Sequence, residues 1–204
     1  MNELSKKNDA HFLTETAFLV AIILLMKLTG LSSIPIGPLN MTLTMVPIAI
    51  GAMLSGPLVG CILGTVYGFT SLYDAVSGGS LMTGFFFQIS PINTFILCVV
   101  TRAVVGACAG WIFRFLHKAD PTKSICYFVT GLLTPVLNTV LFMGYIVLVF
   151  YNTEYIQERV ASLGATNPIM FIVLLVGVQG LIEALTGAII GGGVAKAVAK
   201  ALGR

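Results

Sequence analysis

Gly131–Tyr151 has the sequence GLLTPVLNTVLFMGYIVLVFY, an apolar run interrupted near its middle by Pro135, Asn138 and Thr139. A run of about 20 apolar residues is long enough to cross the hydrocarbon core of a bilayer. In hydrocarbon, an unpaired amide or a carbonyl freed by proline costs several kcal/mol, so such groups face other helices or a cavity. The stretch therefore predicts a membrane helix that borders an enclosed polar site.

The composition of the chain is that of an integral membrane protein. Of its 204 residues, 57% are hydrophobic and 9% are charged, whereas about 25% charged residues is typical of a soluble domain. The mean hydropathy is +0.99. After the polar residues 1–12, the longest hydrophilic segment is the short loop His117–Lys123. We therefore expect residues 1–204 to form a single membrane domain, with 1–12 as an N-terminal tail.

Apolar runs separated by turn signals predict six transmembrane helices in one compact bundle, which is an all-α fold. The expected spans are Leu13–Leu31, Met41–Leu54, Pro57–Tyr73, Ile92–Leu116, Ile125–Phe150 and Pro168–Val198. The second span is short and contains Pro47, so we expect it to be tilted, kinked or only partly embedded.

The basic residues indicate the orientation of the bundle, because Lys and Arg collect on the cytoplasmic side of short loops. With six spans, one face holds Lys6, Lys7, Arg114, Lys118, Lys123, Lys196, Lys200 and Arg204. The other face holds only Lys27 and Arg159. Both termini, and hence the tail 1–12, are therefore expected to be cytoplasmic.

Three connections of a different character then lie on the outer face: Ser32–Asn40, Asp74–Pro91 and Asn152–Asn167. Two of them exceed about a dozen residues, a length that is more often functional than accidental in a compact domain. We expect these outward-facing loops to form a lid over a site, with plain surface connections as the alternative.

Arg102 lies near the middle of the fourth span, where an arginine is costly enough to need a partner. Glu183 on the last span is the candidate partner, and Gln179 lies one turn from it on the same helix face. One interpretation is a structural ion pair, Arg102–Glu183, that ties two helices together. The other is that Arg102 also receives a ligand carboxylate, with Glu183 and Gln179 orienting its guanidinium.

Other polar and aromatic residues are predicted at or above this depth, which indicates a small-molecule cavity open to the outside. The predicted substrate-binding residues are Asn40, Thr70, Tyr73, Gln88, Asn93, Arg102, Asn138, Tyr145 and Gln179. A larger aromatic ligand would stack on Phe85–Phe87 or Tyr73. The alternative for each aromatic residue is a place in the interfacial aromatic belt.

The sequence gives little support to an enzyme. It has no G-x-x-x-x-G-K-[ST] phosphate loop, so the chain is not expected to hydrolyse a nucleotide by that route. It also has no H-E-x-x-H motif and no G-x-S-x-G elbow. The four cysteines lack metal-ligand spacing, and no metal site is expected.

Small residues recur at helical spacing in several spans. Gly56, Gly60, Gly64 and Gly68 predict a groove along the third span where another backbone approaches closely. Ala17 and Ala21 form a smaller notch on the first span, which has no polar group at mid-depth and is expected to be peripheral. That notch indicates either a docking surface for a partner helix or ordinary packing and lipid contact.

Four stretches together resemble the substrate-binding S components of energy-coupling factor (ECF) transporters. They are IPIGPLNMTLTMVPIAIGAMLSGPLVGCILGTVYGFTSLYDA, TRAVVG of the fourth span, LNTVLFMG of the fifth and GLIEALTGAIIG of the last. The resemblance implies a subunit of the bacterial plasma membrane that captures a water-soluble vitamin from outside. It also implies a coupling transmembrane subunit and two ATPase subunits as partners, with Ala17 and Ala21 as the docking surface on the coupling subunit.

Within that family the chain is most similar to the pantothenate branch, and one buried cation beside hydroxyl and amide groups suits a small hydroxylated carboxylate. Folate, riboflavin or another vitamin remains an alternative. Two functions from other classes of membrane protein also remain as alternatives. One is a stand-alone secondary transporter that uses Arg102 and Glu183 as a proton relay, and the other is a structural membrane subunit without a ligand.

Overall fold

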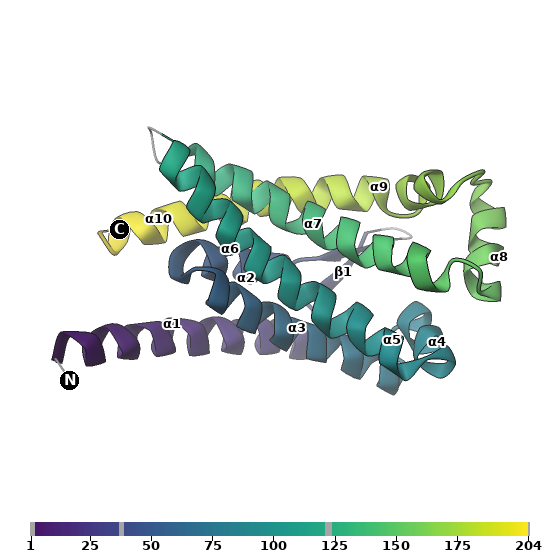
Figure 1. Ribbon diagram of the computed structural model, residues 1–204, viewed down its shortest axis with the longest axis horizontal. Coiled ribbons are helices and arrows are strands. Elements are labelled where there is room, and N and C mark those ends of the chain that lie inside the picture. Colours follow the sequence, from purple (N-terminus) through teal and green to yellow (C-terminus); the bar gives the residue numbers. More distant parts are fainter. Residues whose placement is uncertain (1–2, 37–38, 121–123, 204) are drawn as a thin grey trace.

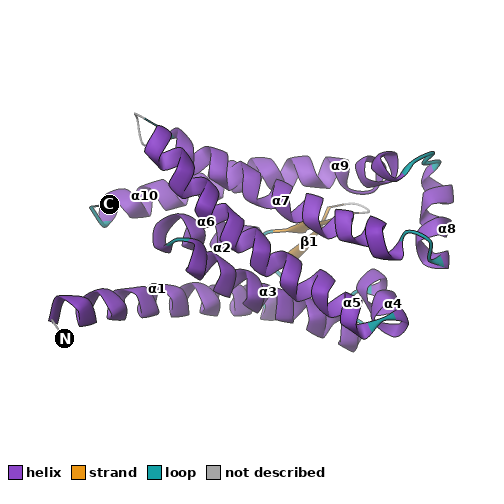
Figure 2. Ribbon diagram, viewed as in Figure 1, coloured by secondary structure: helices purple, strands orange, loops and turns teal. Residues whose placement is uncertain are grey.

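The computed structural model describes residues 3–36, 39–120 and 124–203, with side chains described at 12–32, 42–120 and 124–203. Within these ranges the chain forms a bundle of helices and a short hairpin (Figures 1 and 2). In chain order the elements are α1 (Glu3–Leu28), β1 (Ser33–Ile36), β2 (Leu39–Thr42), α2 (Met45–Ser55), α3 (Pro57–Ser77), α4 (Leu81–Ile89), α5 (Pro91–Phe95), the π-helix η1 (Ile96–Val100), α6 (Thr101–Ala119), α7 (Ile125–Phe150), α8 (Glu154–Leu163), α9 (Pro168–Thr186), the π-helix η2 (Gly187–Gly192) and α10 (Gly193–Ala201).

Four helical segments in the described ranges are long and apolar enough to cross a membrane. They are α3, the continuous run α5–η1–α6 (Pro91–Ala119), α7, and the continuous run α9–η2–α10 (Pro168–Ala201). Each begins within one residue of a predicted span, and α7 agrees with its prediction at both ends. Apolar runs bounded by turn residues are thus a sufficient signal for these long helices.

The predicted count of six spans is not confirmed. α2 has 11 residues, or about 16 Å at 1.5 Å per residue, which is only about half of the hydrocarbon thickness. The first predicted span, Leu13–Leu31, falls on α1, which has 26 residues and begins at Glu3. Most of the predicted tail 1–12 is therefore helical, because no proline or glycine interrupts it after Glu3.

The described part of the chain is helical, as the all-α prediction expects, apart from one short hairpin at the first predicted outer connection. There β1 and β2 pair antiparallel, with Ser33 opposite Thr42 and Ile36 opposite Leu39. Proline cannot donate to a helix ladder, so this proline-containing segment takes an extended path instead. The other two outer connections, expected as loops, contain the helices α4 and α8.

The two chain ends lie on the same side of the bundle. Figure 1 shows that α1 begins and α10 ends at one end, whereas α4, α5 and α8 gather at the opposite end. α2 occupies the half nearer the chain ends, and the hairpin lies inside the bundle beyond it (Figure 2). Non-helical backbone at membrane depth is tolerated only where protein buries it or where it lines a cavity. The hairpin therefore points to a cavity at the α4 and α8 end.

Glycines bring the backbones of α3 and α6 into direct contact. A Cβ atom on Gly60 would lie 2.1 Å from the carbonyl oxygen of Gly106, and one on Gly64 would lie 2.2 Å from that of Arg102. Neither distance is possible for a real side chain, so these positions require glycine. The glycine groove predicted on the third span is thus confirmed, and its contact fixes the height and rotation of Arg102 relative to α3.

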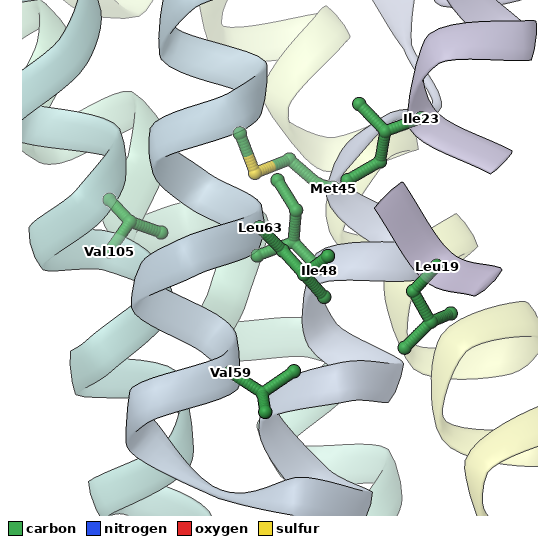
Figure 3. Close-up of a cluster of buried hydrophobic side chains, with 7 residues drawn as sticks. All are labelled: Leu19, Ile23, Met45, Ile48, Val59, Leu63 and Val105. Carbon is green, nitrogen blue, oxygen red and sulfur yellow. The ribbon is translucent and has the colours of Figure 1, made fainter. Parts of the chain in front are cut away.

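The half of the bundle away from the hairpin is a packed apolar core. Figure 3 shows a cluster in which α1, α2, α3 and α6 meet, formed by Leu19, Ile23, Met45, Ile48, Val59, Leu63 and Val105. All seven side chains are buried. Apolar side chains therefore fill this part of the bundle.

Candidate functional site

A cavity of about 680 Å³ lies at the end of the bundle opposite the packed core. Its walls come from α3, α6, α7 and α9, and Thr42 of the hairpin, together with residues of α4 and α8, also borders it. The helices α4 and α8, which lie within the second and third predicted outer connections, therefore border the cavity at the place where a lid was predicted. The volume is within the range of cavities that hold small ligands.

Arg102 projects into this cavity without a carboxylate partner among the described residues. It is the second residue of α6 and is only 6% exposed. Nη1 donates to the carbonyl oxygen of Cys98 at 2.9 Å, and Nε has no hydrogen-bond partner. The guanidinium carbon lies 4.6 Å from the centre of the Tyr67 ring and 4.8 Å from that of Phe142. Aromatic faces thus hold the cation, and part of its donor capacity remains unused.

The π-helical segment η1 lies just before Arg102 in the chain. Its π-helical turn, Ile96–Val100, immediately precedes α6 and includes Cys98, the acceptor of the Arg102 hydrogen bond. π-Helical turns shift the helix register and are frequent at functional sites. The second π-helix, η2, begins four residues after Glu183, so both charged residues lie beside such a turn.

The expected ion pair between Arg102 and Glu183 is not formed in the described structure. Glu183 is 5% exposed, and its Oε1 accepts hydrogen bonds from the Thr42 backbone N–H at 2.8 Å and from Gln179 Nε2 at 2.9 Å. The hairpin backbone thus supplies one of the donors that Arg102 was expected to provide. Both charged side chains line the same cavity, but neutral groups hold each of them.

Asn138 is the third deeply placed polar group. It lies on α7 three residues after Pro135, and its Oδ1 is buried without a hydrogen-bond partner. A buried amide oxygen without a donor costs about 1–3 kcal/mol. Arg102 Nε lacks an acceptor and Asn138 Oδ1 lacks a donor, and both residues line the cavity. A ligand with an acidic group and an N–H or O–H donor would complement both.

An ion pair that the sequence reasoning missed lies at the cavity wall. Lys27 of α1 pairs with Asp74 of α3, and each side chain is 27% exposed. Arg159 of α8 lines the cavity as well, with its guanidinium carbon 5.7 Å from the Tyr155 ring centre. The position of Asp74 on the cavity wall could have been predicted from helical spacing, because Tyr67, Asp74 and either Thr70 or Ser71 share one face of α3.

The structure brings four of the predicted substrate-binding residues together and separates the others. Thr70, Arg102, Asn138 and Gln179 line the cavity. Tyr73, Gln88, Asn93 and Tyr145 are not among its lining residues. The side chain of Asn40 lies outside the described residues, although its backbone belongs to β2.

The four separated residues have identifiable reasons for their positions. Tyr73 is 68% exposed on the outer side of α3. Gln88 is exposed near the C-terminal end of α4, whereas the residues of that helix that line the cavity, Leu81–Thr83, are at its start. The Tyr145 hydroxyl donates to Asn93 Oδ1 at 3.1 Å, so these two join α7 to α5.

The Phe85–Phe87 stretch is not an open stacking platform in the described structure. Phe86 is fully buried against Phe150, with ring centres 4.2 Å apart. Phe85 stacks on Tyr155 of α8 at 5.0 Å. These contacts hold α4 against α7 and α8 over the cavity.

The notch on α1 faces away from the rest of the chain. Ala17 and Ala21 are both exposed, and Phe18 beside them is 66% exposed. The opposite face of α1 contributes Leu19 and Ile23 to the core. The predicted peripheral position of this surface is confirmed, whereas its partner stays a prediction.

No group of three or more His, Cys, Asp or Glu residues in the described part of the chain is placed to hold a metal ion. The fold and the cavity define a polytopic membrane protein with a site for a small polar molecule. Residues 11–191 match the family model of the ECF transporter substrate-specific component, so the chain belongs to that family. It is therefore the vitamin-binding membrane subunit of a transporter and not itself an enzyme. A comparison with curated proteins finds no match.

Proposed function

We propose that the chain captures pantothenate at the outer face of the bacterial plasma membrane and delivers it to an ECF module. The observation that carries the proposal is the buried Arg102 guanidinium, which has no carboxylate partner among the described residues and faces a cavity lined by hydroxyl and amide groups. Burial of such a cation is energetically costly unless a ligand anion pairs with it. Pantothenate supplies a carboxylate, an amide and two hydroxyl groups.

The charges around the cavity support an acidic ligand. Its lining includes three basic side chains, Lys27, Arg102 and Arg159, and two acidic ones, Asp74 and Glu183. Lys27 and Asp74 neutralise each other, which leaves two basic groups and one acidic group. The remaining field therefore favours an anion.

The aromatic contacts favour an aliphatic acid over folate or riboflavin. The rings of Tyr67 and Phe142, which line the cavity, are already in contact with the Arg102 guanidinium. Tyr155 and Phe85 stack on each other. A flat ring system would have to displace one of these contacts, whereas a branched aliphatic acid would not.

The partner surface is proposed on α1, with both termini in the cytoplasm. Ala17 and Ala21 are exposed at a helical spacing that lets another helix approach closely. The partners would be a coupling transmembrane subunit and two ATPase subunits, because the chain lacks a nucleotide-binding loop. A proton relay through Arg102 and Glu183 is not favoured, since these side chains do not contact each other.

Thermal stability of the detergent-purified chain against a panel of water-soluble vitamins tests the proposal. A ligand at 100 times its Kd adds about 2.7 kcal/mol to the stability. We expect a shift with pantothenate that is lost in Arg102→Ala and kept in Arg114→Ala, a matched control farther along α6 outside the cavity. A shift with folate or riboflavin alone would show that the ligand is that vitamin and not pantothenate. No shift with any vitamin would contradict the proposed site.

A further inference from the structure

Glu183 is a buried carboxylate whose described partners are all neutral. The Thr42 backbone N–H and Gln179 Nε2 both donate to Oε1, and no described group donates to Oε2. Glu183 lies on α9 with 5% of its surface exposed, and it lines the cavity. Burial of a carboxylate is costly unless its lone pairs are satisfied. One oxygen of Glu183 therefore remains available to a group inside the cavity.

Arg102 is the counterpart of Glu183 in this respect. It is also more than nine-tenths buried, and its Nε lacks an acceptor. Oppositely charged groups that serve only to join helices would contact each other, because a buried charge without a partner is unfavourable. The two are instead held apart by aromatic rings on one side and by the hairpin backbone on the other. The arrangement suits a molecule that contacts both.

We infer that Glu183 is a specificity-determining residue that accepts a hydrogen bond from a hydroxyl or amine of the ligand, away from the acidic group that Arg102 holds. This inference rests on the proposed function and adds a second recognition point to it. The cavity then selects acids that also carry such a donor. Pantothenate fits, because its carboxylate and its two hydroxyl groups lie at opposite ends of the molecule.

Two analogues separate the two recognition points. Panthenol replaces the carboxylate of pantothenate with a hydroxymethyl group, and N-(3,3-dimethylbutanoyl)-β-alanine lacks both hydroxyl groups. A hydrogen bond to a charged group contributes about 1.5–3 kcal/mol, which corresponds to about 10- to 100-fold in affinity. We therefore expect the unmutated chain to bind pantothenate about 10- to 100-fold more tightly than the analogue without hydroxyl groups.

The variant Glu183→Gln keeps an oxygen for the Thr42 N–H and removes the charge. We expect the preference for pantothenate over the analogue without hydroxyl groups to fall at least tenfold in this variant. The preference for pantothenate over panthenol should stay unchanged there and fall in Arg102→Met. The control Glu158→Gln, on the exposed side of α8, should leave both preferences unchanged. If Glu183 had a purely structural role, Glu183→Gln would lower the affinity for all three ligands equally.

Two results would overturn the inference while leaving the proposed vitamin in place. One is a Glu183→Gln variant that keeps the full preference for the hydroxyl groups. The other is equal affinity of the unmutated chain for pantothenate and for the analogue without hydroxyl groups, a result that does not depend on the folding of any variant. Failure of the unmutated chain to bind pantothenate at all would instead overturn the proposed vitamin, and the inference with it.

Discussion

Replacement of Arg102 by methionine distinguishes a ligand-binding arginine from one that joins helices. The side chain makes one hydrogen bond to the Cys98 carbonyl and two ring contacts, with Tyr67 and Phe142. The hydrogen bond contributes about 1.5–3 kcal/mol and each ring contact about 0.5–2 kcal/mol. Against this stands a desolvation penalty of several kcal/mol for the buried cation. The two sides nearly cancel.

The ligand-free Arg102→Met variant is therefore expected to unfold within about 3 °C of the unmutated chain, since 1 kcal/mol corresponds to about 2–4 °C at this size. Breakage of a buried ion pair would cost about 3–5 kcal/mol instead, which is a fall of about 6–20 °C. The assay is thermal unfolding in detergent with and without pantothenate. The variant should keep its ligand-free midpoint and lose the shift that pantothenate produces.

A large fall in the ligand-free midpoint would refute this reasoning, because it would show that Arg102 is mainly a structural residue. A pantothenate shift that survives the substitution would refute it as well. The matched control Arg114→Met removes a guanidinium from an exposed position of the same helix and should change neither quantity.

Three further predictions follow from the packing and the charges. Gly64→Leu should destabilise the chain by about 3 kcal/mol or more, at or above the upper end of ordinary single-residue effects, because its Cβ would overlap the α6 backbone. Gly144→Leu, with nothing within 4 Å, should not, and equal losses of the two variants in chemical unfolding would contradict the importance of the close contact. Ala17→Trp should abolish vitamin uptake by the assembled transporter and leave vitamin binding intact, and parallel loss of both in paired uptake and binding assays would argue against a docking role. Lys27→Met should lower the affinity for pantothenate by less than tenfold, because it leaves Asp74 as a repulsive charge at the cavity wall. Unchanged or tighter binding in a titration would contradict this.

The long helices were predictable because their signal is local. The run Ile125–Phe150 is apolar over 26 residues, and a chain in hydrocarbon satisfies its backbone only as a helix or a closed barrel. Arg102, Asn138 and Gln179 were recognisable for a related reason: polar groups at membrane depth have to face protein or a cavity. These two arguments need no knowledge of the tertiary fold.

The remaining features depend on contacts between distant parts of the chain. The Thr42 N–H reaches Glu183 across 141 positions of sequence, and this contact leaves the carboxylate without its expected arginine. Tyr145 pairs with Asn93, and Lys27 with Asp74, for the same kind of reason. Short outer helices such as α4 were missed because Gly-rich and aromatic segments predict loops as readily as helices when they are only about nine residues long.

The measurement that tests the central claim most directly is an isothermal titration of the purified chain with pantothenate. We expect saturable binding of one pantothenate per chain, lost in Arg102→Met and retained in Arg114→Met. Absence of binding to the folded, unmutated chain, or equal binding by Arg102→Met, would contradict the claim that the buried Arg102 guanidinium holds the carboxylate of the vitamin.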